Sequence, residues 1–236
     1  MKKIISIIGP VYTEVNTILI VLNKLKNMKF YSDFVSQIII VDDNSLDGTT
    51  ELLKKIEKDE KFKDDIFIFK SKNSGKGASQ RLAIPLCKGE LTIIQDADLE
   101  YNIENINSLI ELLIKNDYDA VLGFRKLKKT KLYSPYFLFH KVAVITLTIL
   151  TNLLYQSNFR DVCTCYRLIK TPILKRLDIR GERFEFDFSM INKLALMTKK
   201  IGNIQIDYTN RSFKDGKKNT WIVGFYAIKR IARYCL

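Results

Sequence analysis

The sequence of 236 residues contains little of what many small proteins use for stability or catalysis. It has one histidine and four cysteines, of which only Cys163 and Cys165 lie close together. So few scattered cysteines exclude a secreted disulfide scaffold, and a single close pair excludes a zinc ribbon. The cysteine content therefore indicates the reducing environment of the cytoplasm.

Long apolar stretches and long linkers are also missing. The apolar run at residues 4–8 stops at Gly9-Pro10, too early for a signal peptide, and predicts a short buried strand that ends there. Residues 142–159 carry no charge, but interspersed threonine and amide side chains argue against a membrane-spanning helix. A buried helix and a helix in the membrane interface both stay open. Without repeats or a Gly/Ser linker, residues 1–236 are predicted to form one domain.

Negative charge is scarce in the second half of the chain. Residues 1–120 hold 16 Lys and Arg against 19 Asp and Glu, a net charge of −3. Residues 121–236 hold 23 against 7, a net charge of +16. This asymmetry points to an anionic partner for the second half, with nucleic acid, a membrane surface and a phosphorylated substrate as candidates.

The first 123 residues show a regular alternation of elements. Short apolar runs end in polar turns, and helical patterns with one apolar stripe lie between them; the runs are at residues 4–8, 37–41, 66–69, 91–95 and 120–123. This alternation predicts an α/β fold with a mostly parallel sheet and helices on both faces. Ligands of such sheets bind beyond the carboxyl ends of the strands.

Three of the strand ends carry polar motifs whose role the residues alone leave open. Tyr12 and Glu14 can stack on and hydrogen-bond a base or ribose, although a glutamate is also typical of a first helical turn. Asp42 and Asp43 are expected to point to opposite faces, so that at most one of them reaches a given ligand. Gly75-Lys76-Gly77 resembles a phosphate cradle without Walker spacing, and a tight turn explains it equally well.

The fourth strand end carries the most informative motif. The apolar residues 91–94 run into Asp96-Ala97-Asp98-Leu99-Glu100. On an extended strand, carboxylates at i, i+2 and i+4 lie on one side, where they can share a Mg²⁺ or Mn²⁺ ion that also binds a diphosphate. Without a cation, three buried carboxylates would repel one another. We therefore prefer metal binding over a solvated acidic turn.

In this order, the motifs resemble the family-2 glycosyltransferases with the GT-A fold, and most of all their polyprenol-phosphate sugar transferases of the dolichol-phosphate mannose synthase type. The resemblance covers nearly the whole chain. Its motifs are Pro10-x-Tyr12-x-Glu14, Val41-Asp42-Asp43-x-Ser45-x-Asp47-Gly48-Thr49, Asn73-x-Gly75-Lys76-Gly77-Ala78, Asp96-Ala97-Asp98-Leu99-Glu100, Gly123-x-Arg125, Asp161-x-x-Thr164-Cys165-Tyr166-Arg167, Phe184-Glu185-Phe186-Asp187 and Tyr208-x-x-Arg211-x-x-x-x-Gly216-Lys217-Lys218. Each motif alone is weak, but all of them in this order are highly specific.

The resemblance implies a role for each matching residue. The donor would be held by Pro10, Tyr12, Glu14, Val41, Asp43, Lys76, Ala97 and Lys217, and the cation by Asp96, Asp98 and Glu100. The catalytic residues would be Asp98, Arg125, Arg211 and Glu185. Among them, Arg125 and Arg211, together with Lys217, would neutralise the acceptor phosphate and the leaving diphosphate, and Glu185 would lie in the wall around the reacting groups. The family commonly has glutamine where Glu100 stands.

Residues and resemblance together predict a metal-dependent inverting glycosyltransferase. It would transfer a sugar from a GDP- or UDP-sugar to a polyprenyl phosphate, with Mg²⁺ or Mn²⁺ as cofactor, peripherally on the cytosolic face of a membrane. A lipid phosphate is already anionic and needs no strong base, in keeping with the single histidine, His140.

In this interpretation residues 1–123 bind the nucleotide sugar and the cation, and residues 124–236 face the acceptor and the membrane. Residues 136–155 and 221–234 would lie on the bilayer as interfacial helices. A separate membrane-anchoring subunit stays open, and nucleic acid is not expected as a partner.

Two alternatives remain. A family-2 transferase acting on a saccharide hydroxyl, in cell-surface polysaccharide synthesis, would need a base, for which Asp161, Glu185 and Asp187 are candidates. The aromatic residues that alternate with the last two acids are also typical of a half-buried strand. A non-catalytic basic module that binds nucleic acid or membrane would leave the acidic motif after residue 95 unexplained.

Overall fold

The computed structural model describes residues 3–125, 135–183 and 185–209, with the backbone alone at residues 135–140. The strands are β1 (Ile4–Val11), β2 (Val35–Asp42), β3 (Ile66–Phe69), β4 (Leu91–Ile94), β5 (Ala120–Arg125), β6 (Arg167–Lys170) and β7 (Ile201–Ile206). The helices are α1 (Ile18–Asn27), α2 (Thr49–Ile56), α3 (Lys76–Ala83), α4 (Asn105–Lys115), α5 (Pro135–Tyr155), α6 (Thr171–Arg176) and α7 (Glu185–Met197). Single 3₁₀ turns are η1 (Tyr31–Asp33), η2 (Glu60–Phe62) and η3 (Ile84–Leu86).

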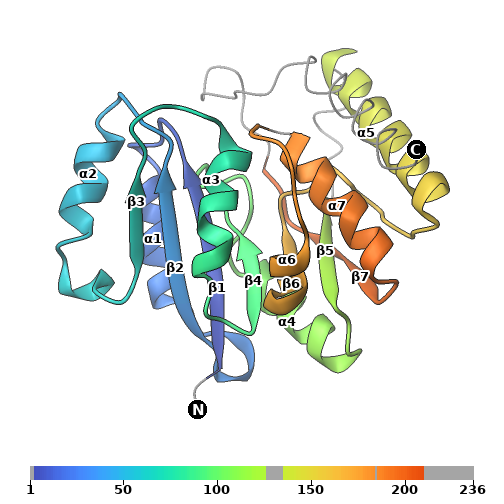
Figure 1. Ribbon diagram of the computed structural model, residues 1–236, viewed down its shortest axis with the longest axis horizontal. Helices are drawn as coiled ribbons and strands as arrows, with labels where there is room; N and C mark the ends of the chain where they lie inside the picture. The colour runs from blue at the N-terminus through green and yellow to red at the C-terminus, as the bar shows by residue number, and fades with distance from the viewer. Residues whose placement is uncertain (1–2, 126–134, 184, 210–236) are drawn as a thin grey trace.

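The strands described form one sheet in the order β3-β2-β1-β4-β6-β5-β7 (Figure 1). All neighbours run parallel except β6, which is antiparallel to both β4 and β5. The other six strands therefore end at one edge, and β6 begins at that edge. The reversal of β6 brings Arg167 and the residues before it to the same edge as the ends of β4 and β5.

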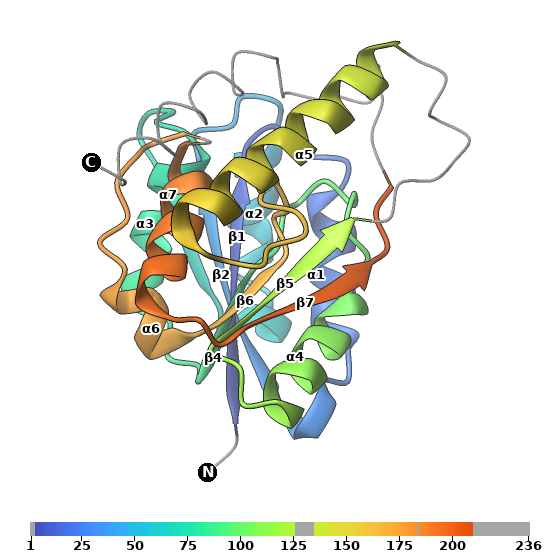
Figure 2. The same ribbon diagram turned by 90° about the vertical axis from the view of Figure 1, so that its right-hand side faces the viewer.

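Helices cover both faces of the sheet, as the alternation predicts (Figure 2). One apolar core lies between the sheet and α1, α2 and α4, and a second lies between the sheet and α3, α5, α6 and α7. The strands serve both cores because neighbouring residues point to opposite faces: Ile7 belongs to the first core and Ile8 to the second. Burial on both faces accounts for the nearly continuous isoleucine and valine runs of β1 and β2. The predicted α/β fold is confirmed.

Strand β1 extends further than the sequence predicts. Instead of ending at Gly9-Pro10, it continues to Val11 and pairs Pro10 with Val41 of β2. Proline is tolerated because β4 pairs with β1 only as far as Ile8, so that β1 has a single strand neighbour beyond this point. The extension carries Tyr12 to the carboxyl edge of the sheet.

The alternating aromatic segment is helical, not a strand. Residues 185–197 form α7, and Phe186 and Phe188 are both buried in the second core. A short alternation of apolar and acidic residues fits the first turns of a buried helix as well as a strand, so the pattern alone does not distinguish the two.

Helix α5 is apolar on two sides. Leu147, Thr151 and Tyr155 face the second core, whereas Ile149 and Leu153 on the opposite side are 54% and 73% exposed. Within the described part of the chain, no helix combines the length and the apolar character needed to cross a bilayer.

The closest approach of α3 to α7 depends on Gly77. A Cβ atom at this position would lie 2.3 Å from Cβ of Phe186 and 2.7 Å from the carbonyl oxygen of Arg183. We expect Gly77→Ala to lower the free energy of unfolding by about 1–3 kcal/mol, because the two segments must separate. Denaturant unfolding measures the change, with Leu82→Ala on the exposed side of α3 as the control. A Gly77→Ala protein as stable as the wild type would contradict this packing.

Candidate active site

The predicted site residues gather where the direction of strand order changes. Strand β2 lies on one side of β1 and β4 lies on the other. The loops after β1 and β4 therefore start at neighbouring strand ends and lead away from each other. In open α/β sheets this is the position where ligands bind. The loops after β2 and β5 flank it.

The loop after β1 is hydrogen-bonded onto the loop after β2. The amides of Thr13, Glu14 and Val15 donate to the side chains of Ser45, Thr49 and Asp47, at 2.9, 3.0 and 3.3 Å respectively. Thr13 has a positive φ of 51°, which a network of this kind can hold. Tyr12 stays 38% exposed at the edge of the sheet. The polar residues after β2 thus shape the loop that presents Tyr12.

Asp42 and Asp43 are both buried and contact different segments, in line with their predicted opposite directions. Asp42 accepts hydrogen bonds from Ser45 in the loop that follows it and from Thr50 in the first turn of α2. Asp43 forms an ion pair with Lys70 and accepts the amides of Ser74 at 2.9 Å and Gly75 at 2.7 Å. Asp43 therefore organises the loop that leads into α3.

The glycine-rich loop before α3 is a tight turn. Its amides at residues 74 and 75 bind Asp43, and the amide of Ala78 donates to the carbonyl of Glu182. Gly75 has a φ of +97°, and a Cβ atom there would lie 2.6 Å from the same carbonyl oxygen. Because these amides donate to protein acceptors, the candidate for ligand contact in this segment is the side chain of Lys76.

The acidic motif after β4 does not continue the strand. The strand ends at Ile94, residues 97 and 98 form a turn, and Leu99 has a φ of 59°. The expectation that Asp96, Asp98 and Glu100 line one side of an extended strand is therefore wrong. A positive φ at a leucine is uncommon, and it redirects the chain between the second and third acids.

Each outer acid of this turn has a partner. Lys76 Nζ lies 2.6 and 2.8 Å from the two carboxylate oxygens of Asp96, and 3.2 Å from Sγ of Cys165. Burial works against the charge of Lys76, but the attraction of Asp96 prevails and raises the pKa of the lysine well above its usual value. Glu100 accepts a hydrogen bond of 2.6 Å from the hydroxyl of Tyr208.

Asp98 lies between these two acids. Burial, and then the negative charges of Asp96 and Glu100, raise the pKa of Asp98 to about 7. Over residues 3–125, 135–183 and 185–209, no three histidine, cysteine, aspartate or glutamate side chains converge into a group able to hold a metal ion. The acids are thus close enough to repel one another without forming a complete set of protein ligands.

Arg125, at the end of β5, is held on two sides. Its Nε and Nη2 donate to the carboxylate of Asp161 at 2.7 and 3.0 Å. Its guanidinium carbon lies 5.2 Å from the ring centre of Tyr208. Desolvation opposes the charge, but Asp161 raises the pKa of Arg125 well above its usual value. Asp161 belongs to one of the sequence motifs, but its pairing with Arg125 could not be predicted, because the two residues are 36 positions apart and share no local pattern.

A second buried ion pair lies behind the site. Arg167 is 1% exposed and donates to Asp187 of α7 at 2.8 Å. Burial raises and Arg167 lowers the pKa of Asp187, and the net shift is downward. Glu185, two residues earlier, accepts a hydrogen bond of 3.1 Å from the amide of Glu182 and closes the turn that starts α7.

The structure brings together most of the predicted residues at one edge of the sheet. The strand and loop positions of Pro10, Tyr12, Val41, Asp43, Lys76, Asp96, Ala97, Asp98, Glu100 and Arg125 all lie there. Arg211, Lys217 and the segment 221–234 fall outside the described residues, as does the side chain of His140.

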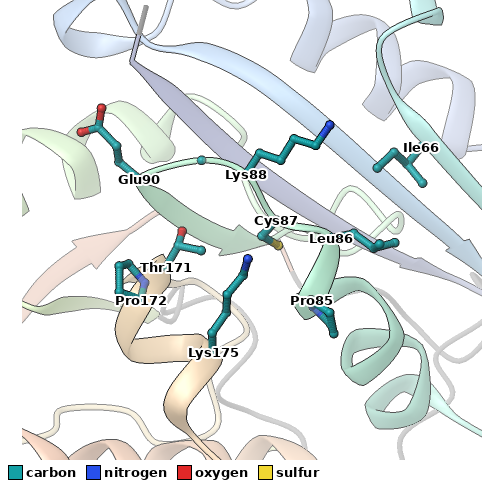
Figure 3. Close-up of a pocket in the computed structure, with 10 residues that line it drawn as sticks. Ile66, Pro85, Leu86, Cys87, Lys88, Glu90, Thr171, Pro172 and Lys175 are labelled. Atoms are coloured by element: carbon teal, nitrogen blue, oxygen red, sulfur yellow. The ribbon is translucent and has the colours of Figure 1, made fainter. Parts of the chain in front are cut away.

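A hollow of about 810 Å³ lies at the other end of the sheet, where β4 begins (Figure 3). Pro85 and Leu86 of η3 and Pro172 and Lys175 of α6 form part of its wall. No predicted site residue lines it.

The chain belongs to the glycosyl transferase family 2, whose model matches residues 6–178. The resemblance drawn from the motifs is therefore confirmed, and the fold is of the GT-A type.

Individual relatives extend this finding. An uncharacterized protein of Methanocaldococcus jannaschii is 28% identical over 211 residues, which are 87% of either chain. An undecaprenyl-phosphate 4-deoxy-4-formamido-L-arabinose transferase of Aeromonas hydrophila is 30% identical over 124 residues, 52% of this chain and 37% of that protein. Glucosyl-3-phosphoglycerate synthase of Mycobacterium tuberculosis, crystallised with Mn²⁺, UDP and phosphoglyceric acid, superposes with a TM-score of 0.70 at 15% identity, over 99% of this chain and 78% of that one.

The raised pKa of Asp98 predicts a loss of stability as the pH rises. The folded protein holds this proton more tightly than the unfolded chain, whose aspartate has a pKa of 3.8. The resulting stabilisation is complete below this value and is lost as the pH rises through about 7. Without metal, Asp98→Asn should exceed the wild type in unfolding free energy by about 2–4 kcal/mol above pH 8, because the amide stays neutral.

Denaturant unfolding between about pH 4 and pH 8 measures this difference, which should shrink toward the acidic end. Asp33→Asn, at an exposed position, is the matched control. An Asp98→Asn advantage that does not change with pH would show that the carboxyl group is not the cause.

Proposed function

We propose that this family-2 glycosyltransferase transfers a sugar from a nucleotide-diphosphate sugar to the phosphate of a polyprenyl phosphate. One observation carries the choice of acceptor: two of the three acids that could serve as a base are buried and paired with arginines. Asp161 is paired with Arg125, and Asp187 with Arg167. Both carboxylates are engaged by arginine N–H donors, so neither is placed to take a proton from a hydroxyl acceptor. An anionic phosphate acceptor needs no base.

The proposed reaction is a single displacement at the anomeric carbon. An oxygen of the acceptor phosphate attacks from the side opposite to the diphosphate and forms a new carbon–oxygen bond. The carbon–oxygen bond to the diphosphate breaks, its electron pair leaves with the nucleoside diphosphate, and the configuration inverts. Since no proton moves, the protein has to align the reactants and neutralise charge.

We assign the donor to the edge formed by β1, β2 and β4. Its base and ribose would contact Pro10, Tyr12, Glu14, Val41, Asp43 and Ala97, and Lys76 would contact the diphosphate. The nucleoside diphosphate of the donor is UDP or GDP in this proposal. The support is positional, because the exposed ring of Tyr12 lies at the end of β1, next to the acidic turn after β4.

The acidic turn fits a cation that is shared with the diphosphate. Mg²⁺ is usually bound by one or two carboxylates and substrate phosphates, and an all-protein cage is not required. Asp98 is the proposed principal ligand, with Asp96 and Glu100 beside it, because burial and then the charges of these two acids raise the pKa of Asp98, and a nearby cation would offset both effects. When bound, Mg²⁺ or Mn²⁺ would supply positive charge at the leaving diphosphate.

The acceptor phosphate is assigned to Arg125. A guanidinium has five N–H donors, and the side chain of Asp161 accepts from Nε and Nη2, which leaves donors for an anion. Arg211 and Lys217 would add charge there, and Glu185 would lie in the wall nearby. The single domain would thus divide its work, with residues 1–123 on the donor side and 124–236 on the acceptor side. The name of the Aeromonas hydrophila relative supports an acceptor of this class.

The outer side of α5 supports a peripheral position on the cytosolic face of a membrane. Val142, Ile145, Ile149 and Leu153 form an exposed apolar stripe at helical spacing. A helix that also has an apolar outer side favours an apolar partner there, and acyl chains are such a partner. The proposal needs no separate anchoring subunit.

The function is tested with labelled UDP- or GDP-sugars, Mn²⁺ and undecaprenyl phosphate. We expect a lipid-linked sugar, and a turnover lower by about 10²–10³-fold in Asp98→Ala, because the leaving diphosphate loses its charge compensation. Asp33→Ala, an exposed acid outside the site, should keep full turnover. Unchanged turnover in Asp98→Ala would contradict the mechanism, and transfer to a saccharide hydroxyl alone would contradict the acceptor.

The membrane position is tested by sedimentation with vesicles of phosphatidylglycerol and phosphatidylcholine. Ile149→Glu with Leu153→Glu should weaken binding by about tenfold or more, since two apolar side chains no longer enter the bilayer. Ile114→Glu, on α4 at the other face of the sheet, is the matched control. Equal binding of both variants would contradict docking through α5.

A further inference from the structure

Tyr208 lies two residues beyond β7 and contacts both sides of the candidate site. Strand β7 pairs with β5 so that Ile206 is opposite Arg125. The chain then passes Tyr101, with which Tyr208 forms an isolated antiparallel bridge. The phenol is thereby held between the end of β5 and the acidic turn after β4.

The hydroxyl of Tyr208 fixes the third acid of that turn. It donates a hydrogen bond of 2.6 Å to Oε2 of Glu100. The backbone supports the same contact, because the amide of Thr209 donates to the carbonyl of Glu100 at 2.8 Å. A charge-assisted hydrogen bond of this length orients the carboxylate.

The ring of Tyr208 supports the arginine. The guanidinium carbon of Arg125 lies 5.2 Å from the ring centre, and Asp161 holds the guanidinium through Nε and Nη2. The ring also lies against Tyr101, whose ring centre is 5.1 Å away. Arg125 is thus placed by a carboxylate at its edge and an aromatic face beside it.

We propose that Tyr208 is a positioning residue that sets Glu100 and Arg125 relative to each other, through its hydroxyl on one and its ring on the other. The inference rests on the proposed function, in which these residues serve the cation and the acceptor phosphate. Because the displacement needs both reactants in line, one rigid side chain in contact with both groups keeps their separation constant.

Two substitutions separate the two contacts. Tyr208→Phe keeps the ring and removes the hydroxyl, so Mn²⁺ measured calorimetrically with UDP or GDP should bind about tenfold more weakly. The Tyr208→Phe variant should bind geranyl phosphate, a soluble probe for the acceptor, as tightly as the wild type does. Tyr208→Leu removes the ring as well, and geranyl phosphate should then bind about three- to tenfold more weakly too.

Controls distinguish positioning from loss of structure. Tyr118→Phe, beside Gly202 and away from the site, should change neither affinity. In a Glu100→Gln background, Tyr208→Phe should have little further effect on Mn²⁺ binding, because the coupled partner is already altered. Thermal unfolding of each variant checks the fold.

The outcomes are distinct. The assignment is overturned if Tyr208→Phe binds Mn²⁺ as tightly as the wild type. It is also overturned if Tyr208→Phe and Tyr208→Leu lose the same affinity for Mn²⁺ and the same affinity for geranyl phosphate. If wild-type protein binds Mn²⁺ with a nucleotide but does not bind geranyl phosphate, the proposed acceptor fails, while the effect of Tyr208→Phe on Mn²⁺ still decides the role of the hydroxyl.

Discussion

The ion pair between Lys76 and Asp96 joins segments that are far apart in the chain. It connects the first residue of α3 to the turn after β4, and Cys165, from the segment before β6, lies against the same amine. Without it, Asp96 would lose the cation that it contacts in a partly buried turn of three acids. The glycines on either side of Lys76 allow the start of α3 to lie directly against residues 182–186. Even with Lys76 in place, burial and then the negative charges of Asp96 and Glu100 raise the pKa of Asp98.

Compensated charge is the general feature of this site. Asp43 is paired with Lys70, Asp161 with Arg125, and Asp187 with Arg167. Buried pairs of this kind add little net stability over apolar residues, but they fix where each charged group points. Such an arrangement suits chemistry that depends on orientation and charge neutralisation more than on proton transfer. It also agrees with a chain that has one histidine.

The acidic and basic parts of the chain lie in different parts of the sheet, and the proposed function gives each part a separate role. The acidic motifs follow β2 and β4, in the part of the sheet next to β1, whereas Arg125 and Arg167 belong to β5 and β6 on the other side of β4. The step in charge near residue 120 thus runs across one continuous sheet. In the proposal it separates donor from acceptor within a single domain.

The sequence by itself determined the alternation of strands and helices, the covered faces of the sheet and the family, because periodicity and strand-end motifs are local. It also predicted that the polar residues after β1, β2 and β4 meet, since parallel strands end at one edge. Only the tertiary structure decided that the acidic motif turns at Leu99, that the aromatic segment is a helix, and that Arg125 binds Asp161 and Tyr208. These outcomes depend on contacts between residues distant in sequence, because no local pattern shows which charged groups will pair or that α3 will pack closely against residues 185–197.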